Sequence, residues 1–193
     1  MIKGDKKPQI VLASKSPRRR EFFSIVTENF LTFESDVNEN KYNSFTAKEQ
    51  VMFLANDKCV YASQYYIDSV IVACDTLVEL NGLVMGKPKD KEEAFLMLSA
   101  LSGNTHTVYT GVAIKIGEEI DSFVSKTDVT FLELQEEEIN EYINTGEPLD
   151  KAGAYGIQGK AARFIKGIDG DYFNVLGLPI SAIYRNLHAK HIV

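Results

Sequence analysis

The order in which short apolar runs and helical patterns follow each other constrains the fold most strongly. An apolar run at Gln9–Ala13 precedes a helical pattern at Arg19–Phe30, and Phe30–Ser35 precedes a longer helical pattern at Thr46–Tyr66. Val70–Cys74 is a third apolar run and is typical of a central, fully buried strand. Strands that alternate with helices in this way favour an α/β fold.

The second half of the chain adds antiparallel signals. His106–Ile116 and Ile120–Leu134 alternate apolar and polar residues on either side of a short Gly-Glu-Glu stretch, which predicts a long hairpin. Asn81-Gly82 predicts a tight type I′ turn. We therefore expect a mixed sheet flanked by helices. The remaining segments are predicted helices at Asp90–Gly103, Glu136–Gly146 and Leu178–Lys190, a glycine-rich and then extended stretch at Glu147–Ile165, and a turn at Asp169-Gly170.

Two helix starts are marked by capping residues. Ser16 precedes Pro17, and this pair fits an N-cap followed by the first helical position. Thr46 and Glu49 have the spacing of a capping box.

Within the second helix, Lys58 falls in the middle of the apolar stripe. A lysine there either extends its ammonium to the surface or points into a polar cavity, and both alternatives remain open.

Composition narrows the class of protein. With 193 residues the chain has room for one domain or two small lobes around a shared core. The net charge of −6 argues against a general nucleic-acid binder. No apolar run approaches a membrane span and Met1–Pro8 is polar, so we expect neither a membrane anchor nor a signal peptide. Cys59 and Cys74 lack metal-ligand spacing and indicate reduced core residues of a cytoplasmic protein.

Three consecutive arginines begin the first predicted helix. Arg18, Arg19 and Arg20 oppose the usual preference for acidic residues at a helix N-terminus. Free backbone N–H groups and guanidinium donors together suit a phosphate group. The alternative is a set of solvated surface arginines that form ion pairs.

Asp75 is the main candidate for acid–base chemistry. It stands where the apolar run Val70–Cys74 breaks, and ligands of open α/β sheets bind at such strand ends. A turn-capping role is the alternative. Leu77 stands where a dehalogenase-type phosphatase needs a second acid, so that class is excluded.

Other charged residues suggest further contacts. The nearby acids Glu34, Asp36 and Glu39, together with Asp75, have the oxygen ligands that Mg²⁺ or Mn²⁺ prefers, although the sequence alone favours an acidic loop in solvent. Lys87 follows a glycine in a string one residue short of a P-loop, which predicts a tight turn that presents a lysine. The three histidines, His106, His188 and His191, form no ligand cluster.

Five strings in order resemble the Maf family of nucleoside triphosphate pyrophosphatases. They are LASKSPRR (Leu12–Arg19), CDTLVELNGLVMGKP (Cys74–Pro88), LSGNTHTVYTGVAI (Leu101–Ile114), GEPLDKAGAYGIQGKAARFI (Gly146–Ile165) and GDYFNVLGLP (Gly170–Pro179). The match covers nearly the whole chain as a single domain and leaves residues 1–8 as an unmatched extension. Asn38 stands where the family often has a second acid, and Cys59 where alanine is usual.

The resemblance implies a fold like that of the inosine triphosphate pyrophosphatases, with an elongated mixed sheet and two lobes around a cleft. It implies metal-dependent hydrolysis of a triphosphate to a monophosphate and pyrophosphate, with Asp75 as proton acceptor. Thr76 and the Gln158 of GIQG match the dTTP/UTP branch, with modified pyrimidine nucleotides as further candidate substrates, and a homodimer is expected. Substrate choice is associated with Arg18, Thr76 and Gln158, whereas Arg20 matches no family position and is expected on the surface.

The expected site can be stated residue by residue. Asp75 and Glu39 are expected to hold Mg²⁺ or Mn²⁺, and Thr76 and Gln158 to meet the base. The remaining substrate-binding residues are Ser14, Ser16, Arg18, Arg19, Lys58 and Lys87. Two rival hypotheses are a nucleotide-sensing regulator of cell division without turnover and a structural protein that uses the basic turn as a docking patch.

Overall fold

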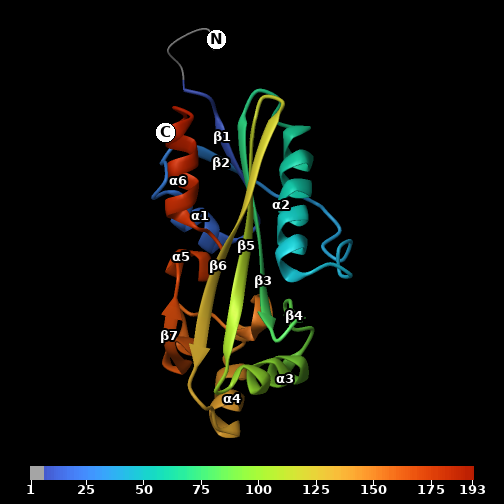
Figure 1. Cartoon of the computed structure of the whole chain (residues 1–193), viewed down its shortest axis with the longest axis vertical. Coiled ribbons are helices and arrows are strands. Elements are labelled where there is room, and N and C mark those ends of the chain that lie inside the picture. The colour runs from blue at the N-terminus through green and yellow to red at the C-terminus, as the bar shows by residue number, and fades with distance from the viewer. Residues whose placement is uncertain (1–6) are drawn as a thin grey trace.

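The computed structural model describes residues 7–193, which form one twisted mixed sheet with helices on both faces (Figure 1). Its order is β2-β1-β3-β5-β6-β7, with β4 paired to β3. β1 is parallel to β2 and β3, whereas all other pairs are antiparallel. The expected mixed α/β sheet is therefore confirmed. The strands are β1 (Ile10–Ala13), β2 (Phe30–Phe33), β3 (Val70–Leu80), β4 (Leu83–Met85), β5 (Thr105–Ile116), β6 (Glu119–Phe131) and β7 (Ile165–Asp169).

The first two helices begin at the positions that their capping residues predicted. The Ser16 hydroxyl accepts a hydrogen bond from the Arg19 N–H, and Thr46 and Glu49 form a complete capping box. The α-helices are α1 (Pro17–Phe23), α2 (Ala47–Ser63), α3 (Lys91–Leu101), α4 (Glu136–Ile143), α5 (Tyr172–Val175) and α6 (Ile180–Ala189). Three 3₁₀ helices follow α4 at η1 (Glu147–Asp150), η2 (Ala152–Ala154) and η3 (Lys160–Phe164).

The core is divided by the sheet because successive strand residues face opposite sides. Odd-numbered residues of β3 such as Ile71 and Ala73 pack with Cys59 of α2. Even-numbered residues such as Val72 pack in the larger cluster that contains Phe23 of α1 and Ile183 of α6. Figure 1 shows α2 on one side of the sheet and α1, α5 and α6 on the other.

Gly111 lets α2 lie close to the sheet. It is the β5 partner of Asp75, and a Cβ at this position would overlap the backbone of Val51 in α2. A side chain here would therefore push away the helix that carries Lys58. The glycine is needed for close approach and not for an unusual backbone angle.

Three boundaries differ from the sequence predictions. The first helix ends at Phe23 rather than Phe30, because Phe30 is needed as the parallel partner of Ile10. The segment expected to be extended after the glycines forms 3₁₀ turns before β7 begins at Ile165. β3 continues past Cys74 to Leu80 because β5 pairs with it along that length.

Helices and turns gather towards two ends of the long strands β3, β5 and β6. Figure 1 shows β1, β2, α1, α2 and α6 around one end, and β4, α3, α4 and β7 around the other.

Cys59 and Cys74 are buried and free, as expected. Residues 1–6 of the expected extension, and most of the polar stretch Met1–Pro8, lie outside the described residues. In the part of the chain that is described, no helix has the length and apolar character needed to cross a bilayer.

Candidate active site

Asp75 lies beside the end of β1. Ala13, the last residue of β1, pairs with Ala73, so β3 has no β1 partner at Asp75. On its other side Asp75 pairs with Gly111 of β5. The prediction that β3 ends at Asp75 was wrong, but a local sheet edge exists there because the neighbouring strand ends. The chain leaving β1 enters α1 at this point.

Asp75 belongs to a cluster of three charged side chains. The Lys58 ammonium donates to Asp75 Oδ1 at 2.5 Å and to Glu39 Oε1 at 2.7 Å. Asp75 is 7% exposed and Lys58 9%, whereas the Glu39 side chain is 55% exposed. Lys58 thus points inward, which resolves the alternatives for its orientation. The cluster extends from the buried sheet to the surface.

Burial and neighbouring charges act on these carboxyl groups in opposite directions. Burial raises the pKa of Asp75, and the charges of Lys58 and Arg19 offset part of that rise. Partial burial also acts to raise the pKa of Glu39, but the hydrogen bond from Lys58 and the charges of Lys58 and Lys87 lower it overall. A buried carboxylate with a raised pKa is a stronger base than a free carboxylate, which suits it to accepting a proton.

Glu39 and Asp75 suit a divalent cation only in part. Both carboxylates contact the Lys58 ammonium, so a positive group already lies between them. Within residues 7–193, no three His, Cys, Asp or Glu side chains gather as a metal-binding group. Mg²⁺ is commonly bound by one or two carboxylates together with substrate phosphates. The donor set therefore fits a cation that is bound jointly with a phosphate ligand.

Thr76 and Arg19 lie on the other face of the sheet. Arg19 donates to the carbonyl oxygens of Gly177 and Cys74 at 2.8 and 2.7 Å, and to Thr76 Oγ1 at 2.8 Å. Three donors of Arg19 are thus used to join α1, β3 and the loop before α6. Gly177 lies close to this contact, because a Cβ there would be 3.0 Å from Thr76 Oγ1.

A chain of hydroxyl groups continues from Thr76. Thr110 donates to the Asn174 carbonyl at 3.1 Å, so in its 2.9 Å bond with Thr76 the Thr76 hydroxyl is the donor. Asn174 is fully buried and donates to Thr127 Oγ1. Sequence reasoning missed Thr110 and Asn174, although both lie in strings that carry the family resemblance. Threonines in an alternating strand give no separate signal.

The basic turn has one exposed and two partly buried arginines. Arg20 is exposed, as expected, whereas Arg18 and Arg19 are intermediate. Ser14 accepts a hydrogen bond from the Ser16 N–H, so both predicted serines shape the turn before α1. Among the grouped acids, Glu34 forms an exposed ion pair with Lys15 and does not join the cluster, and Asp36 is exposed.

Lys87 and Gln158 lie on neighbouring loops. Lys87 is exposed, and its charge lowers the pKa of Glu39, after the stronger effects of burial and Lys58. The Gly153 N–H donates to the Gly86 carbonyl at 3.0 Å, which joins the segment before Gln158 to the segment before Lys87. Gln158 is exposed in a turn after η2. Its predicted contact with a base stays a prediction.

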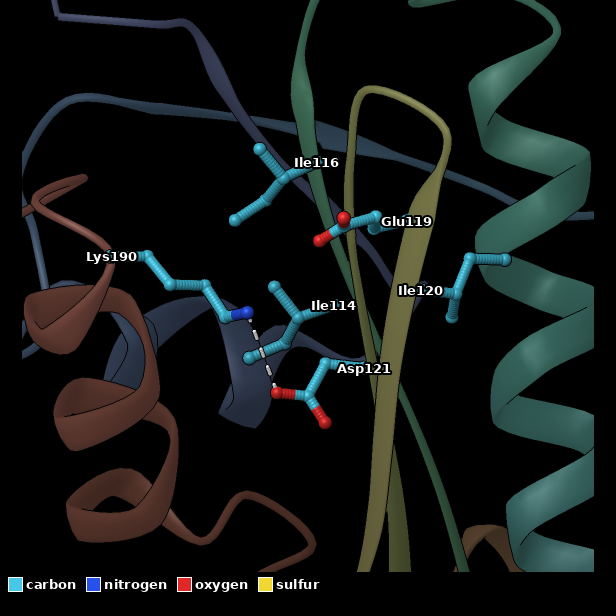
Figure 2. A pocket seen from close by; sticks show the side chains of 6 residues that line it. All are labelled: Ile114, Ile116, Glu119, Ile120, Asp121 and Lys190. Atoms are coloured by element: carbon cyan, nitrogen blue, oxygen red, sulfur yellow. Dashed lines mark ion pairs between the residues drawn. The ribbon is translucent and has the colours of Figure 1, made fainter.

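A separate hollow lies at the far tip of the hairpin. Figure 2 shows it between β5–β6 and the end of α6, with Lys190 Nζ 3.6 Å from Asp121 Oδ2. Its volume is about 370 Å³. The lining residues are Ile114, Ile116, Glu119, Ile120, Asp121 and Lys190, and none is a predicted site residue. The charged cluster therefore lies elsewhere.

Comparison with known proteins shows which family this chain resembles. The family described as Maf-like protein matches residues 9–190. A dTTP/UTP pyrophosphatase of Geobacillus sp. (strain WCH70) is 46% identical over 93% of this chain and 96% of the relative. A dTTP/UTP pyrophosphatase of Carboxydothermus hydrogenoformans is 46% identical over 93% of this chain and 97% of the relative.

Solved structures confirm the fold alone. The Staphylococcus aureus Ham1 protein matches with a TM-score of 0.53 at 13% identity, over 94% of this chain and 99% of that one. A Coxiella burnetii HAM1 protein matches with a TM-score of 0.51 at 12% identity, with the same coverage. Because the family match spans residues 9–190 and the sequence relatives cover almost their full length, this chain belongs to the Maf-like protein family.

Proposed function

We propose that this chain is a metal-dependent nucleoside triphosphate pyrophosphatase that acts on dTTP and UTP. The observation that carries the proposal is the Glu39–Lys58–Asp75 cluster, placed where β1 ends and α1 begins. Relatives named dTTP/UTP pyrophosphatase share about 45% of the sequence, which supports this substrate class. The products are a nucleoside monophosphate and pyrophosphate.

Asp75 acts as the proton acceptor. The water oxygen bonds to a phosphorus atom of the α–β anhydride as the bond from that phosphorus to the bridging oxygen breaks, so that the monophosphate and pyrophosphate separate, and a proton of the water passes to Asp75. Lys58 holds Asp75 in place through their 2.5 Å contact and adds positive charge beside it. Glu39 and Asp75 would hold Mg²⁺ or Mn²⁺, and a bound cation supplies charge neutralisation on the phosphate oxygens.

The remaining residues bind and orient the nucleotide. Arg18, Arg19 and Lys87 neutralise the triphosphate, because such transfers depend mainly on positioning and on stabilisation of charge. The N-terminus of α1, with Ser14 and Ser16, adds backbone donors for a phosphate. Arg19 has three donors on protein oxygens, so its contribution is mainly to hold the site and secondarily to add charge.

Gln158 and Thr76 contribute to base recognition in different ways, the first by direct contact and the second by supporting the site. Gln158 is exposed and offers both a donor and an acceptor to a pyrimidine edge. Thr76 is engaged by Arg19 and Thr110, so it supports the site from the opposite face of β3. The homodimer and the cytoplasmic location stay predictions, and size-exclusion chromatography with light scattering tests the first.

The test is a panel of nucleoside triphosphates with Mn²⁺ or Mg²⁺, with identification of both products. We expect pyrophosphate from dTTP and UTP, and a fall of about 10³-fold in kcat for Asp75→Asn, which keeps the shape of the side chain but cannot accept the proton. Equal hydrolysis by the variant would refute the role of Asp75. Tight binding of dTTP without any product would instead support the regulator hypothesis.

A further inference from the structure

The turn that carries Gln158 is built around two side chains that the proposed reaction does not use. Gly156–Gly159 is a β-turn in which the Gly159 N–H donates to the Gly156 carbonyl at 2.9 Å. Ile157 in this turn is buried, whereas Gln158 is exposed. The turn is therefore fixed to the core on one side and presents Gln158 on the other.

Tyr142 and Glu147 hold both ends of this turn. The Gly156 N–H donates to the Tyr142 hydroxyl at 3.0 Å, and the Lys160 N–H donates to Glu147 Oε2 at 3.1 Å. The Tyr142 hydroxyl in turn donates to Glu147 Oε1 at 3.0 Å. One hydroxyl and one carboxylate thus link α4 and η1 to the backbone on either side of Gln158.

The two glycines of the turn make room for this carboxylate. A Cβ at Gly156 would lie 2.8 Å from Glu147 Oε1, and a Cβ at Gly159 would overlap the same carboxylate. Tyr142 is fully buried. Burial, with a smaller effect of the Glu147 charge, raises the pKa of Tyr142, so its hydroxyl keeps the proton that it donates. The backbone therefore wraps around Glu147.

We infer that Tyr142 and Glu147 are positioning residues for nucleotide recognition, which hold the Gly156–Gly159 turn so that Gln158 meets the pyrimidine base. The inference rests on the proposed function, in which Gln158 contacts the base. Because no hydrogen bond or ion pair among the described residues joins the turn to Asp75 or Lys58, its loosening affects nucleotide binding more than the chemical step.

Two variants and one matched control test this inference. Tyr142→Phe removes the hydroxyl and leaves the Gly156 N–H without its acceptor. Glu147→Gln has one acceptor oxygen instead of two, so it cannot accept from both Tyr142 and Lys160 in the present geometry. Glu141→Gln is the control, because Glu141 lies on the same helix, is 70% exposed and pairs only with Arg163 at 3.4 Å in the described residues.

Hydrogen exchange and steady-state kinetics are measured on the full chain. In both variants we expect faster amide exchange in residues 156–160, a KM for dTTP and UTP raised about tenfold and a kcat changed by less than about threefold. The control is expected to match the wild type in each measurement. Circular dichroism verifies that the variants are folded.

The outcomes separate the inference from the function on which it rests. A wild-type protein that hydrolyses neither dTTP nor UTP would refute the proposed function and with it the recognition role of the turn. An active wild type with unchanged exchange in both variants would overturn the inference alone. Faster exchange with an unchanged KM would also overturn it, because the turn would then be held for structural reasons only.

Discussion

Asp75 and Thr76 are adjacent in the chain, but they face opposite sides of the sheet and have different surroundings. Asp75 is held by the charge of Lys58, which also contacts Glu39. Thr76 is held by the Arg19 guanidinium and by a chain of hydroxyl groups that ends at the Asn174 carbonyl, and these contacts form the hydrogen-bonded face of β3. The comparison shows that the carboxylates of the proposed reaction lie on one face of β3, whereas Arg19 on the other face uses its donors in hydrogen bonds that fix the backbone of the strand.

The charged face is tested first, because the largest effect is expected there. In Lys58→Met, Asp75 loses its ion-pair partner and the phosphate site loses a positive charge. We expect kcat/KM for dTTP to fall by about 10²–10³-fold. Lys48→Met is the control, because Lys48 lies on the same helix and is exposed. A loss of less than about threefold at Lys58 would contradict the assignment.

The hydrogen-bonded face is expected to matter more for stability. In Arg19→Lys, one ammonium replaces the planar guanidinium that bonds to Cys74, Gly177 and Thr76 on separate segments. The free energy of unfolding should fall by about 2–3 kcal/mol, as measured by urea denaturation. Arg20→Lys changes an exposed neighbour and should have no measurable effect. Equal stability of the two variants would show that the three bonds contribute little.

His106 gives the hydrogen-bonded face a pH dependence of its own. It lies four residues before Thr110 on β5 and therefore on the same face as Thr76. Burial lowers the pKa of His106 to about 4, and its Nε2 contacts the Tyr155 hydroxyl at 2.8 Å. The unfolded chain binds a proton near pH 6.5, which the folded protein does not bind until about pH 4. Stability is therefore lost as the pH falls below the pKa of the histidine in the unfolded chain.

The measurement is the free energy of unfolding at pH 7 and pH 5. His106 should account for a loss of about 2 kcal/mol across this interval. His106→Gln does not titrate, so its loss should be smaller than that of the wild type by this amount. The same loss in both proteins would assign the pH dependence to the carboxyl groups.

Local signals in the sequence predicted where helices begin and where a turn forms, because each signal acts between residues that are close together in the chain. Ser16, the Thr46–Glu49 pair and Asn81-Gly82 act within a few residues, and each forms the expected cap or turn. Lys58 and Glu39, which join Asp75 in its cluster, lie outside the five family strings and were proposed from the apolar stripe of the second helix and from the acids after the second strand. Predicted boundaries were wrong where pairing with a distant strand determines them. The first helix was predicted to reach Phe30, which instead pairs with Ile10 in the sheet.

The sequence by itself determined the mixed α/β fold, the helix starts and the acid, lysine and arginine types of the candidate site. Only the tertiary structure decided that Lys58 joins Glu39 to Asp75, and that Arg19 is engaged by Cys74, Gly177 and Thr76. It also showed that Glu147 braces the Gln158 turn. The reason is physical: these contacts join segments far apart in the chain, and their geometry exists only once β1 ends beside β3 and α2 packs on Gly111.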